Sequence, residues 1–292
     1  MKNWKGAWAA IPTPMRDGEL DLEALERFLS FLLDGHVDGV VVCGTTGEAA
    51  TLRRDERLQL YARCREVIAG RVPLLAGVGT NDTASTIDNA KDAAQAGMDG
   101  LLVVTPYYNK PNQEGLFRHF MALAEAVDLP QILYNVPSRT GTNLLPATIA
   151  RLSLESERFA GIKDATGDML VASETRKTVR PDFLMFSGDD ATTLPFICLG
   201  GCGAISVVAN VAPRLMHDIC DLALNADLQR ARALHHEMLP LFRALFSDTS
   251  PIPLKAVLSA KKLGIANELR APLYAMQGES LKNLIERCKA WI

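Results

Sequence analysis

The sequence predicts an α/β fold, a TIM (β/α)8 barrel with a C-terminal helical appendage, on three observations. Short apolar runs alternate with amphipathic stretches eight times within residues 1–225, the order of a closed parallel barrel. The runs are apolar along nearly their whole length, as parallel strands buried on both faces require. A doubly wound open sheet would look similar locally, but no G-x-G-x-x-G follows the first run, so the barrel is favoured.

The predicted strands and helices follow each other in strict order. The strands cover residues 7–11, 39–43, 73–77, 101–104, 131–134, 160–163, 183–186 and 204–208. The stretches between them carry apolar residues at helical spacing, and the first follows Asp21, a residue typical of a helix N-cap. These helices cover residues 22–33, 53–69, 83–96, 113–127, 145–152, 169–179, 191–199 and 213–226.

The strand signal stops after about residue 226. Helical patterns then cover 228–246, 254–263 and 279–291, separated by proline-containing segments. The sequence therefore predicts a barrel domain at 1–225 and a helical domain at 226–292.

Composition excludes several classes of protein. With 292 residues, 48% of them hydrophobic, the chain can bury a large core. A net charge of -3 with interspersed signs provides no basic field for nucleic acid. The apolar run at 6–11 ends at Pro12, too early for a signal peptide or a membrane span. We expect a cytoplasmic protein with small-molecule partners, no nucleic acid and no membrane.

The cysteines and histidines do not suggest a metal site. None of the six cysteines forms a CxxC pair, and His235-His236-Glu237 lacks the H-E-x-x-H spacing that places two imidazoles on one helix face. We expect reduced, mostly buried thiols and no metal.

Polar segments, four of them with a glycine, follow five of the predicted strands. In a parallel barrel the active site is built at the carboxyl ends of the strands, so these segments should meet there. They are residues 44–48 (Gly-Thr-Thr-Gly-Glu), 105–109, 134–141, 163–168 and 187–190.

Lys163 is the most unusual of these residues because it ends an apolar strand. Side chains alternate along a strand, so Lys163 shares its face with Gly161 and Ala165, which leave room beside the amine. Tyr134 ends the neighbouring strand, about 4.8 Å away. A desolvated lysine can form a Schiff base with a carbonyl, and a nearby phenol can move the protons. A lone lysine more often reaches solvent and a lone tyrosine more often lies in the core, so the prediction depends on the pair.

These motifs together resemble the dihydrodipicolinate synthase family of Schiff-base aldolases, which also holds N-acetylneuraminate lyase. The resemblance covers essentially the whole chain. It runs through residues 44–48, 104–109, 132–141, 161–163, 187–190 and 203–206.

The resemblance implies a lyase that condenses pyruvate with aspartate semialdehyde to 4-hydroxy-tetrahydrodipicolinate, in diaminopimelate and lysine biosynthesis. Lys163 would form the imine with pyruvate and supply the electron sink, so no cofactor is implied. Tyr134 would be the acid/base group, exchanging protons with water through Thr45 and Tyr108.

The resemblance also implies the substrate-binding residues. Thr46 and the backbone of its turn would hold the pyruvate carboxylate, although a plain loop is an equally good interpretation of that turn alone. Arg139 would bind the carboxylate of the semialdehyde, because a guanidinium matches two oxygens at once. Gly188 and the carbonyl region of Ile205 would line the pocket. The implied assembly is a homotetramer, a dimer of tight dimers, or a homodimer.

Three positions depart from the family pattern. Asp164 replaces a glutamate, Ala49 replaces a serine, and Ser250 stands where an asparagine often precedes Pro-Ile-Pro. None of the three positions is assigned a bond-making role, but they leave open a different substrate specificity within the family.

Three other functions remain to be weighed. A keto-sugar-acid lyase is the nearest, and Arg139 with Thr45 and Thr46 argues against it. A non-catalytic sensor on the same barrel would lack Tyr134 or Lys163, and both are present. A phosphate-handling barrel would carry a glycine-rich phosphate loop after the seventh or eighth strand, and we find none in a recognisable form.

Feedback inhibition by lysine is expected to be weak. Members of this family place a lysine site at the tight dimer interface, and this chain keeps Tyr107 there. However, Ser85 stands where sensitive members have a glutamate, and Arg54 and Arg57 stand at histidine positions. Asp82 is the one nearby compensation for a ligand with two ammonium groups.

Overall fold

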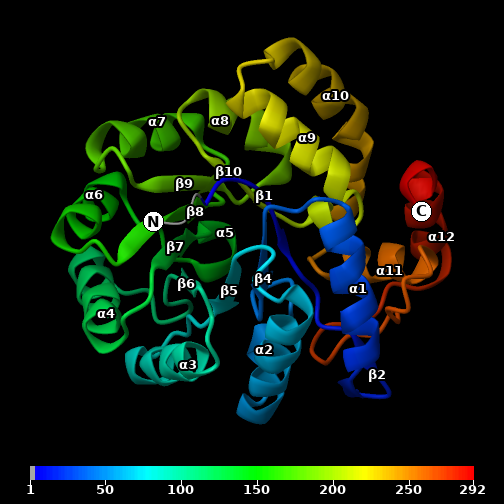
Figure 1. The fold of residues 1–292 in the computed structure, drawn as a ribbon, viewed down its shortest axis with the longest axis horizontal. Helices are drawn as coiled ribbons and strands as arrows, with labels where there is room; N and C mark the ends of the chain where they lie inside the picture. The colour runs from blue at the N-terminus through cyan, green and yellow to red at the C-terminus, as the bar shows by residue number, and fades with distance from the viewer. Residues whose placement is uncertain (1–3) are drawn as a thin grey trace.

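The structure is a computed structural model that describes residues 4–292, and its centre is a closed barrel of eight parallel strands (Figure 1). The predicted barrel is confirmed, and each strand lies within two residues of its expected bounds. Around the barrel the order is β1 (Gly6–Ala10), β10 (Gly203–Ser206), β9 (Leu184–Ser187), β8 (Phe159–Asp164), β7 (Gln131–Asn135), β6 (Gly100–Val104), β5 (Leu74–Gly77) and β4 (Gly39–Val42).

Alternation along the strands divides the core into two layers. Residues such as Leu133 and Ile162 belong to the layer between strands and helices, whereas Ile132 and Tyr134 belong to a cluster inside the barrel. The interior cluster is closed by large side chains, among them Trp8 and Phe186, with ring centroids 5.5 Å apart. The interior of the barrel is therefore a packed core and not a channel.

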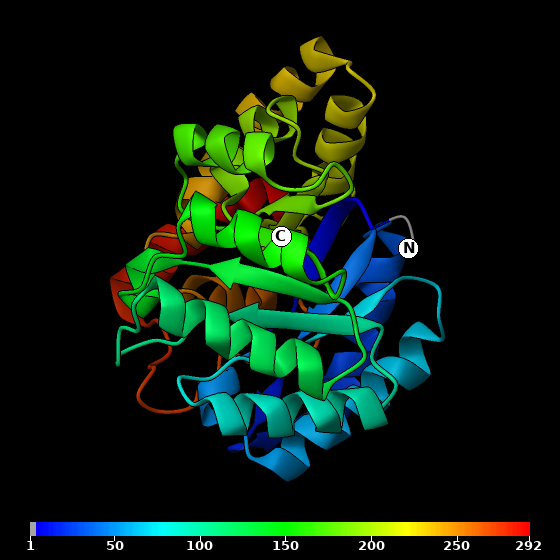
Figure 2. The same ribbon diagram turned by 90° about the vertical axis from the view of Figure 1, so that its left-hand side faces the viewer.

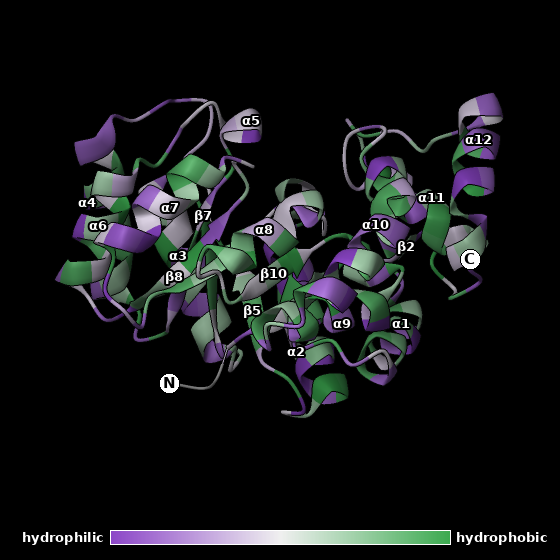
Figure 3. Ribbon diagram, turned by 90° about the horizontal axis from the view of Figure 1, so that it is seen from above, coloured by the Kyte–Doolittle hydropathy of each residue, from purple (hydrophilic) through white to green (hydrophobic). Residues whose placement is uncertain are grey.

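The helices that follow the strands form an outer ring (Figures 1 and 2). Asp21 caps the first, since its carboxylate accepts from the Ala24 N–H at 2.9 Å. Figure 3 shows helices that carry hydrophobic and hydrophilic residues side by side, as the amphipathic pattern predicted. The helices of the outer ring are α1 (Leu22–Asp34), α2 (Arg54–Ile68), α3 (Thr83–Gln95), α4 (Gln113–Ala126), α6 (Pro146–Glu155), α7 (Met169–Thr178), α8 (Thr193–Cys198) and α9 (Pro213–Leu224).

Three kinds of element lie outside the sequence-based prediction. They are the hairpin of β2 (Met15–Arg16) and β3 (Glu19–Leu20), the short helix α5 (Pro137–Thr140), and the 3-10 turns η1 (Ala49–Thr51) and η3 (Val208–Asn210). Segments of two to four residues are too short to show a periodic pattern.

The C-terminal region is helical, as predicted, and lies along one side of the barrel (Figure 1). Its elements are α10 (Leu228–Leu245), α11 (Ile252–Ala260), α12 (Gly278–Cys288) and the 3-10 turn η4 (Lys289–Trp291). α10 contacts α9, while α12 contacts both α10 and α11. The segment after α11 returns to the carboxyl ends of the strands, where Pro272 and Leu273 line a cavity.

The cysteines are free, and four of the six are buried, while Cys202 is half-buried and Cys198 is exposed. Burial raises the pKa of the Cys43 thiol to about 12, which keeps it protonated and unreactive. Within residues 4–292, no helix is long and apolar enough to cross a membrane. In the same range no three His, Cys, Asp or Glu side chains gather as a metal would require.

Candidate active site

A cavity of about 480 Å³ opens at the carboxyl ends of β4, β5, β6 and β7. This is the end of the barrel at which the sequence predicted the site. The cavity is lined by residues from several of the polar segments predicted to follow the strands, together with residues that follow α10 and α11. They include Thr45, Tyr107, Tyr134, Arg139, Ser250 and Leu273.

Lys163 and Tyr134 lie side by side inside the barrel, as predicted. The two residues are direct neighbours in the register of β7 and β8. Lys163 Nζ lies 4.4 Å from the centroid of the Tyr134 ring. This contact places the Lys163 amine beside the Tyr134 ring. Both residues are buried, with exposures of 5% for Lys163 and 6% for Tyr134. Among residues 4–292, Lys163 has no ion-pair partner, so no carboxylate competes for its amine.

Gly188, directly after β9, leaves space beside the Lys163 side chain because it has no Cβ atom. A Cβ atom at Gly188 would lie 2.7 Å from Ala165 Cβ and 3.0 Å from Lys163 Cε. Both distances are shorter than van der Waals contact. The backbone N–H of Gly188 donates to the carbonyl of Asp164 at 2.6 Å, which holds the carboxyl ends of β8 and β9 together.

Replacing Gly188 by alanine is therefore expected to raise the pyruvate concentration needed for imine formation, by roughly tenfold if about 1.4 kcal/mol of strain reaches the site. The measurement is borohydride trapping across a pyruvate titration. The double variant Gly188→Ala/Ala165→Gly removes the closer contact and should recover part of the loss. An unchanged titration for Gly188→Ala would show that Lys163 moves aside without cost.

The turn at 44–47 follows β4 and is held by its own backbone. The N–H of Gly47 donates to the Gly44 carbonyl, and the N–H of Glu48 donates to the Thr45 carbonyl, both at 3.1 Å. The Thr13 hydroxyl donates to the Gly47 carbonyl at 2.6 Å. Thr45 is exposed and lines the cavity, whereas Thr46 is buried, with 4% exposure. The turn thus presents Thr45 to the cavity on a fixed backbone.

Arg139 lies on α5 at the mouth of the cavity. Its side chain is exposed, and Nη2 donates to the carbonyl of Ser250 at 3.3 Å. Ser250 belongs to the segment between α10 and α11, so the C-terminal region orients the guanidinium through a backbone atom. The arginine retains further N–H groups with which to bind an anion.

Ile205 and Tyr108 lie differently from the residues above. Ile205 is in the interior cluster with Tyr134 and Phe186, at 1% exposure. Tyr108 is 87% exposed with a φ of 73°, and it is Tyr107 that lines the cavity. A single chain therefore does not bring Tyr108 to Tyr134.

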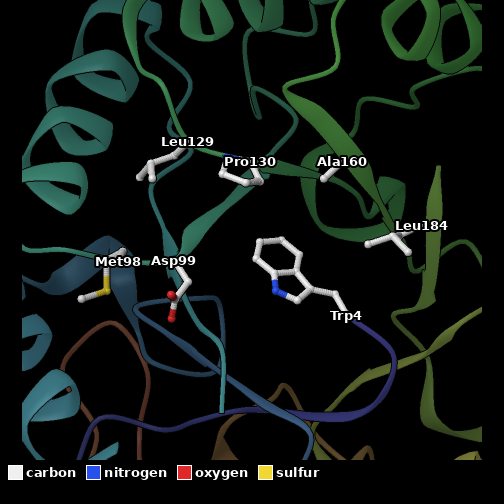
Figure 4. Close-up of a pocket in the computed structure, with 7 residues that line it drawn as sticks. All are labelled: Trp4, Met98, Asp99, Leu129, Pro130, Ala160 and Leu184. Atoms are coloured by element: carbon white, nitrogen blue, oxygen red, sulfur yellow. The ribbon is translucent and has the colours of Figure 1, made fainter. Parts of the chain in front are cut away.

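A second cavity, of about 330 Å³, lies at the opposite end of the barrel (Figure 4). Figure 4 shows the indole of Trp4 between Asp99 on one side and Ala160 and Leu184 on the other. Its lining residues precede or begin the strands, and Asp99 is the one ionisable side chain among them. Residues at this end of a barrel serve stability, so the first cavity is the candidate active site.

Several buried charged residues near the site were not assigned a role from sequence. Asp190 accepts from the N–H groups of Val207 and Val208, at 3.0 and 3.1 Å, and so ties the exits of β9 and β10 together. Burial raises the pKa of Asp190 to about 6. Lys255 and Glu48 form an ion pair next to the 44–47 turn. A lysine inside the apolar run 252–258 was the available signal.

Comparison with known proteins shows the family to which the chain is similar along its length. The model of the dihydrodipicolinate synthetase family matches residues 3–290. The 4-hydroxy-tetrahydrodipicolinate synthase of Thermotoga neapolitana is 46% identical over 273 residues, 92% of each chain. A solved dihydrodipicolinate synthase of Thermotoga maritima has a TM-score of 0.96 at 42% identity, covering 98% of each chain.

A second solved structure matches the chain over nearly its whole length. It is described as the first monomeric dihydrodipicolinate synthase variant, and it matches with a TM-score of 0.97 at 41% identity. The match covers 99% of this chain and 98% of that one. The similarity therefore includes the C-terminal helices as well as the barrel.

Proposed function

The chain belongs to the dihydrodipicolinate synthetase family and condenses pyruvate with aspartate semialdehyde, and we propose that Lys163 is the residue that forms the Schiff base with pyruvate. The observation that supports this assignment is the buried, unpaired amine 4.4 Å from the Tyr134 ring at the carboxyl end of the barrel. Borohydride reduction with pyruvate, followed by peptide mass analysis, tests it. An adduct on any other lysine would refute the assignment.

The reaction follows from the neighbours of Lys163. Its amine adds to the keto carbon of pyruvate, and water leaves as the imine forms. The cationic imine nitrogen then accepts electrons as a methyl proton is removed, which gives the enamine that attacks the aldehyde carbon of the semialdehyde. The aldehyde oxygen takes up a proton, and the amine of the semialdehyde then displaces Lys163 from the imine carbon, which closes the ring and frees the enzyme. We assign these proton transfers to Tyr134, whose ring centroid lies 4.4 Å from Lys163 Nζ. Thr46 with the turn backbone holds the pyruvate carboxylate, Arg139 binds that of the semialdehyde, and Gly188 and Ile205 shape the pocket.

The proton relay needs a second copy of the chain. We assign Thr45 and Tyr108 to the exchange of protons between Tyr134 and water, but Tyr108 points to solvent in the single chain. An exposed tyrosine on a backbone with positive φ is suited to entering an interface. We propose a homotetramer, a dimer of tight dimers, or a homodimer, and sedimentation velocity decides between these and a monomer.

We also propose a cellular location and a division into domains. A metabolic role in amino-acid biosynthesis suits the cytoplasm. The proposed division into a barrel at 1–225 and a helical domain at 226–292 is supported by the end of the alternating pattern at α9.

Lysine is expected to inhibit the reaction weakly. Arg54 binds Asp92 through two hydrogen bonds of 2.7 Å, and Arg57 donates to Asn89 at 2.8 Å. Asp82 caps α3 through the Ser85 N–H at 2.7 Å, so the nearby carboxylates already have partners. A missing carboxylate beside an ammonium costs about 1–3 kcal/mol, or roughly ten- to a hundredfold in affinity.

The measurement is a lysine titration of the initial rate at subsaturating pyruvate. Half-inhibition below millimolar lysine would contradict the prediction and indicate Asp82 as the ligand. The variant Ser85→Glu supplies the missing carboxylate and should increase sensitivity.

A further inference from the structure

A buried ion pair joins the C-terminal helices to the turn that carries Thr45 and Thr46. Lys255, on α11, has no solvent exposure, and its Nζ lies 2.5 Å from Glu48 Oε1. Glu48 follows the turn directly, and its side chain is 1% exposed. Burial lowers the pKa of Lys255, and the Glu48 carboxylate opposes that shift. This pair lies beside the site but takes no part in the chemistry assigned to Lys163.

Stability alone is a poor explanation for this pair. Removing two charges from water costs about as much as their attraction returns, and apolar residues of similar volume often serve a core equally well. Position 255 lies in a buried apolar stretch of α11, since Leu254, Ala256, Val257 and Leu258 are all buried. An apolar side chain would therefore suit position 255 if packing were its only role.

The backbone at Glu48 supports the same conclusion. Glu48 has a φ of 55°, in the left-handed region where glycine is favoured and other residues are strained. The chain nevertheless places a carboxylate there. Its backbone N–H closes the turn by donating to the Thr45 carbonyl at 3.1 Å. The Glu48 side chain is thus attached to the last hydrogen bond of the turn that faces the substrate.

Both oxygens of Glu48 are held by the C-terminal region. Oε2 accepts from the backbone N–H of Arg270 at 2.9 Å, while Oε1 faces Lys255. Lys255 in turn donates to the Glu268 carbonyl at 2.7 Å. The segment that supplies these groups continues into Pro272 and Leu273, which line the active-site cavity. A displacement of Glu48 would therefore move the turn and the cavity wall together.

We propose that Lys255 is a positioning residue for pyruvate, acting through Glu48 to hold the Thr45-Thr46 turn where it binds the substrate carboxylate. This inference rests on the proposed function of that turn. It gives the C-terminal helices a defined part in the active site, although Lys255 itself does not touch the substrate.

The test separates substrate binding from stability. Lys255→Met matches the length of lysine without its charge and leaves Glu48 unpaired, whereas Glu48→Gln/Lys255→Met removes both charges. The double variant should melt closer to the wild type than Lys255→Met does, because no charge stays buried alone. We expect the KM for pyruvate to remain raised in both, by about tenfold, with kcat changed far less.

The matched control is Glu56→Gln. Glu56 is equally buried and binds the Arg270 side chain through hydrogen bonds of 2.5 and 2.7 Å, so it ties the same segment to α2 and not to the turn. It should lower the Tm and leave the KM for pyruvate unchanged. If the double variant regains both Tm and KM, or if Glu56→Gln raises KM equally, Lys255 is only structural and the proposal is wrong.

Two further measurements keep the test decisive. If Lys255→Met does not fold, Glu48→Gln alone serves, because it keeps the shape and the acceptor for the Arg270 N–H; an unchanged KM then refutes the proposal. Borohydride trapping with pyruvate is run on all proteins. Absence of an adduct on wild-type Lys163 would refute the proposed function, whereas trapping of wild type and variants at the same pyruvate concentration refutes this inference alone.

Discussion

Lys163→Arg is expected to abolish the reduced pyruvate adduct and to lower the condensation rate by roughly 10⁴-fold or more, the scale of losing a covalent nucleophile. A guanidinium stays protonated and cannot attack the keto carbon. The site also has little room for a guanidinium, since a Cβ atom at Gly188 would lie only 3.0 Å from Lys163 Cε. Peptide mass analysis after borohydride treatment measures the adduct, and a coupled assay measures the rate.

Two comparisons make this result specific. Lys177→Arg, at an exposed position on α7, changes the same atoms where no substrate binds and should leave adduct and rate intact. Lys255 is the other fully enclosed lysine near the site, but Glu48 lies 2.5 Å from its amine. An adduct on Lys255 in the wild type would mean that the ion pair opens and that the nucleophile has been misassigned.

The fold was largely predictable from sequence because its signals are local. A buried parallel strand must be an apolar run, so the barrel strands were found to within two residues. The placement of Lys163 beside Tyr134 also needed only side-chain alternation and strand adjacency, both of which the register confirms. The hairpin of β2 and β3 and the helix α5 are too short to leave such a pattern.

Other parts of the site depend on contacts that no local pattern encodes. Lys255 and Glu48 are far apart in the chain, and only the return of the segment after α11 brings Glu268 and Arg270 to the turn. Tyr108 illustrates a second limit, because its proposed partner belongs to another copy of the chain. Its sequence motif predicts a role, but the single chain exposes it to solvent.

Arg139→Ala is expected to impair use of aspartate semialdehyde and to spare imine formation with pyruvate. Arg139 lies at the mouth of the cavity, whereas Lys163 is buried inside the barrel, so loss of the Arg139 side chain should not disturb the amine that reacts with pyruvate. Loss of a charge-assisted hydrogen bond of about 1.5–3 kcal/mol should lower kcat/KM for the semialdehyde by roughly 10- to 150-fold. Half-maximal borohydride trapping should occur at the wild-type pyruvate concentration.

Arg139→Lys distinguishes charge from geometry at this position. It keeps the positive charge but loses the fork that binds two oxygens, so kcat/KM for the semialdehyde should fall between the alanine variant and the wild type. The bond from Nη2 to the Ser250 carbonyl, at 3.3 Å, is lost in both variants, so it cannot by itself separate them. If Arg139→Ala reduces pyruvate trapping and semialdehyde turnover equally, the arginine supports the cavity wall through Ser250 and does not bind the second substrate.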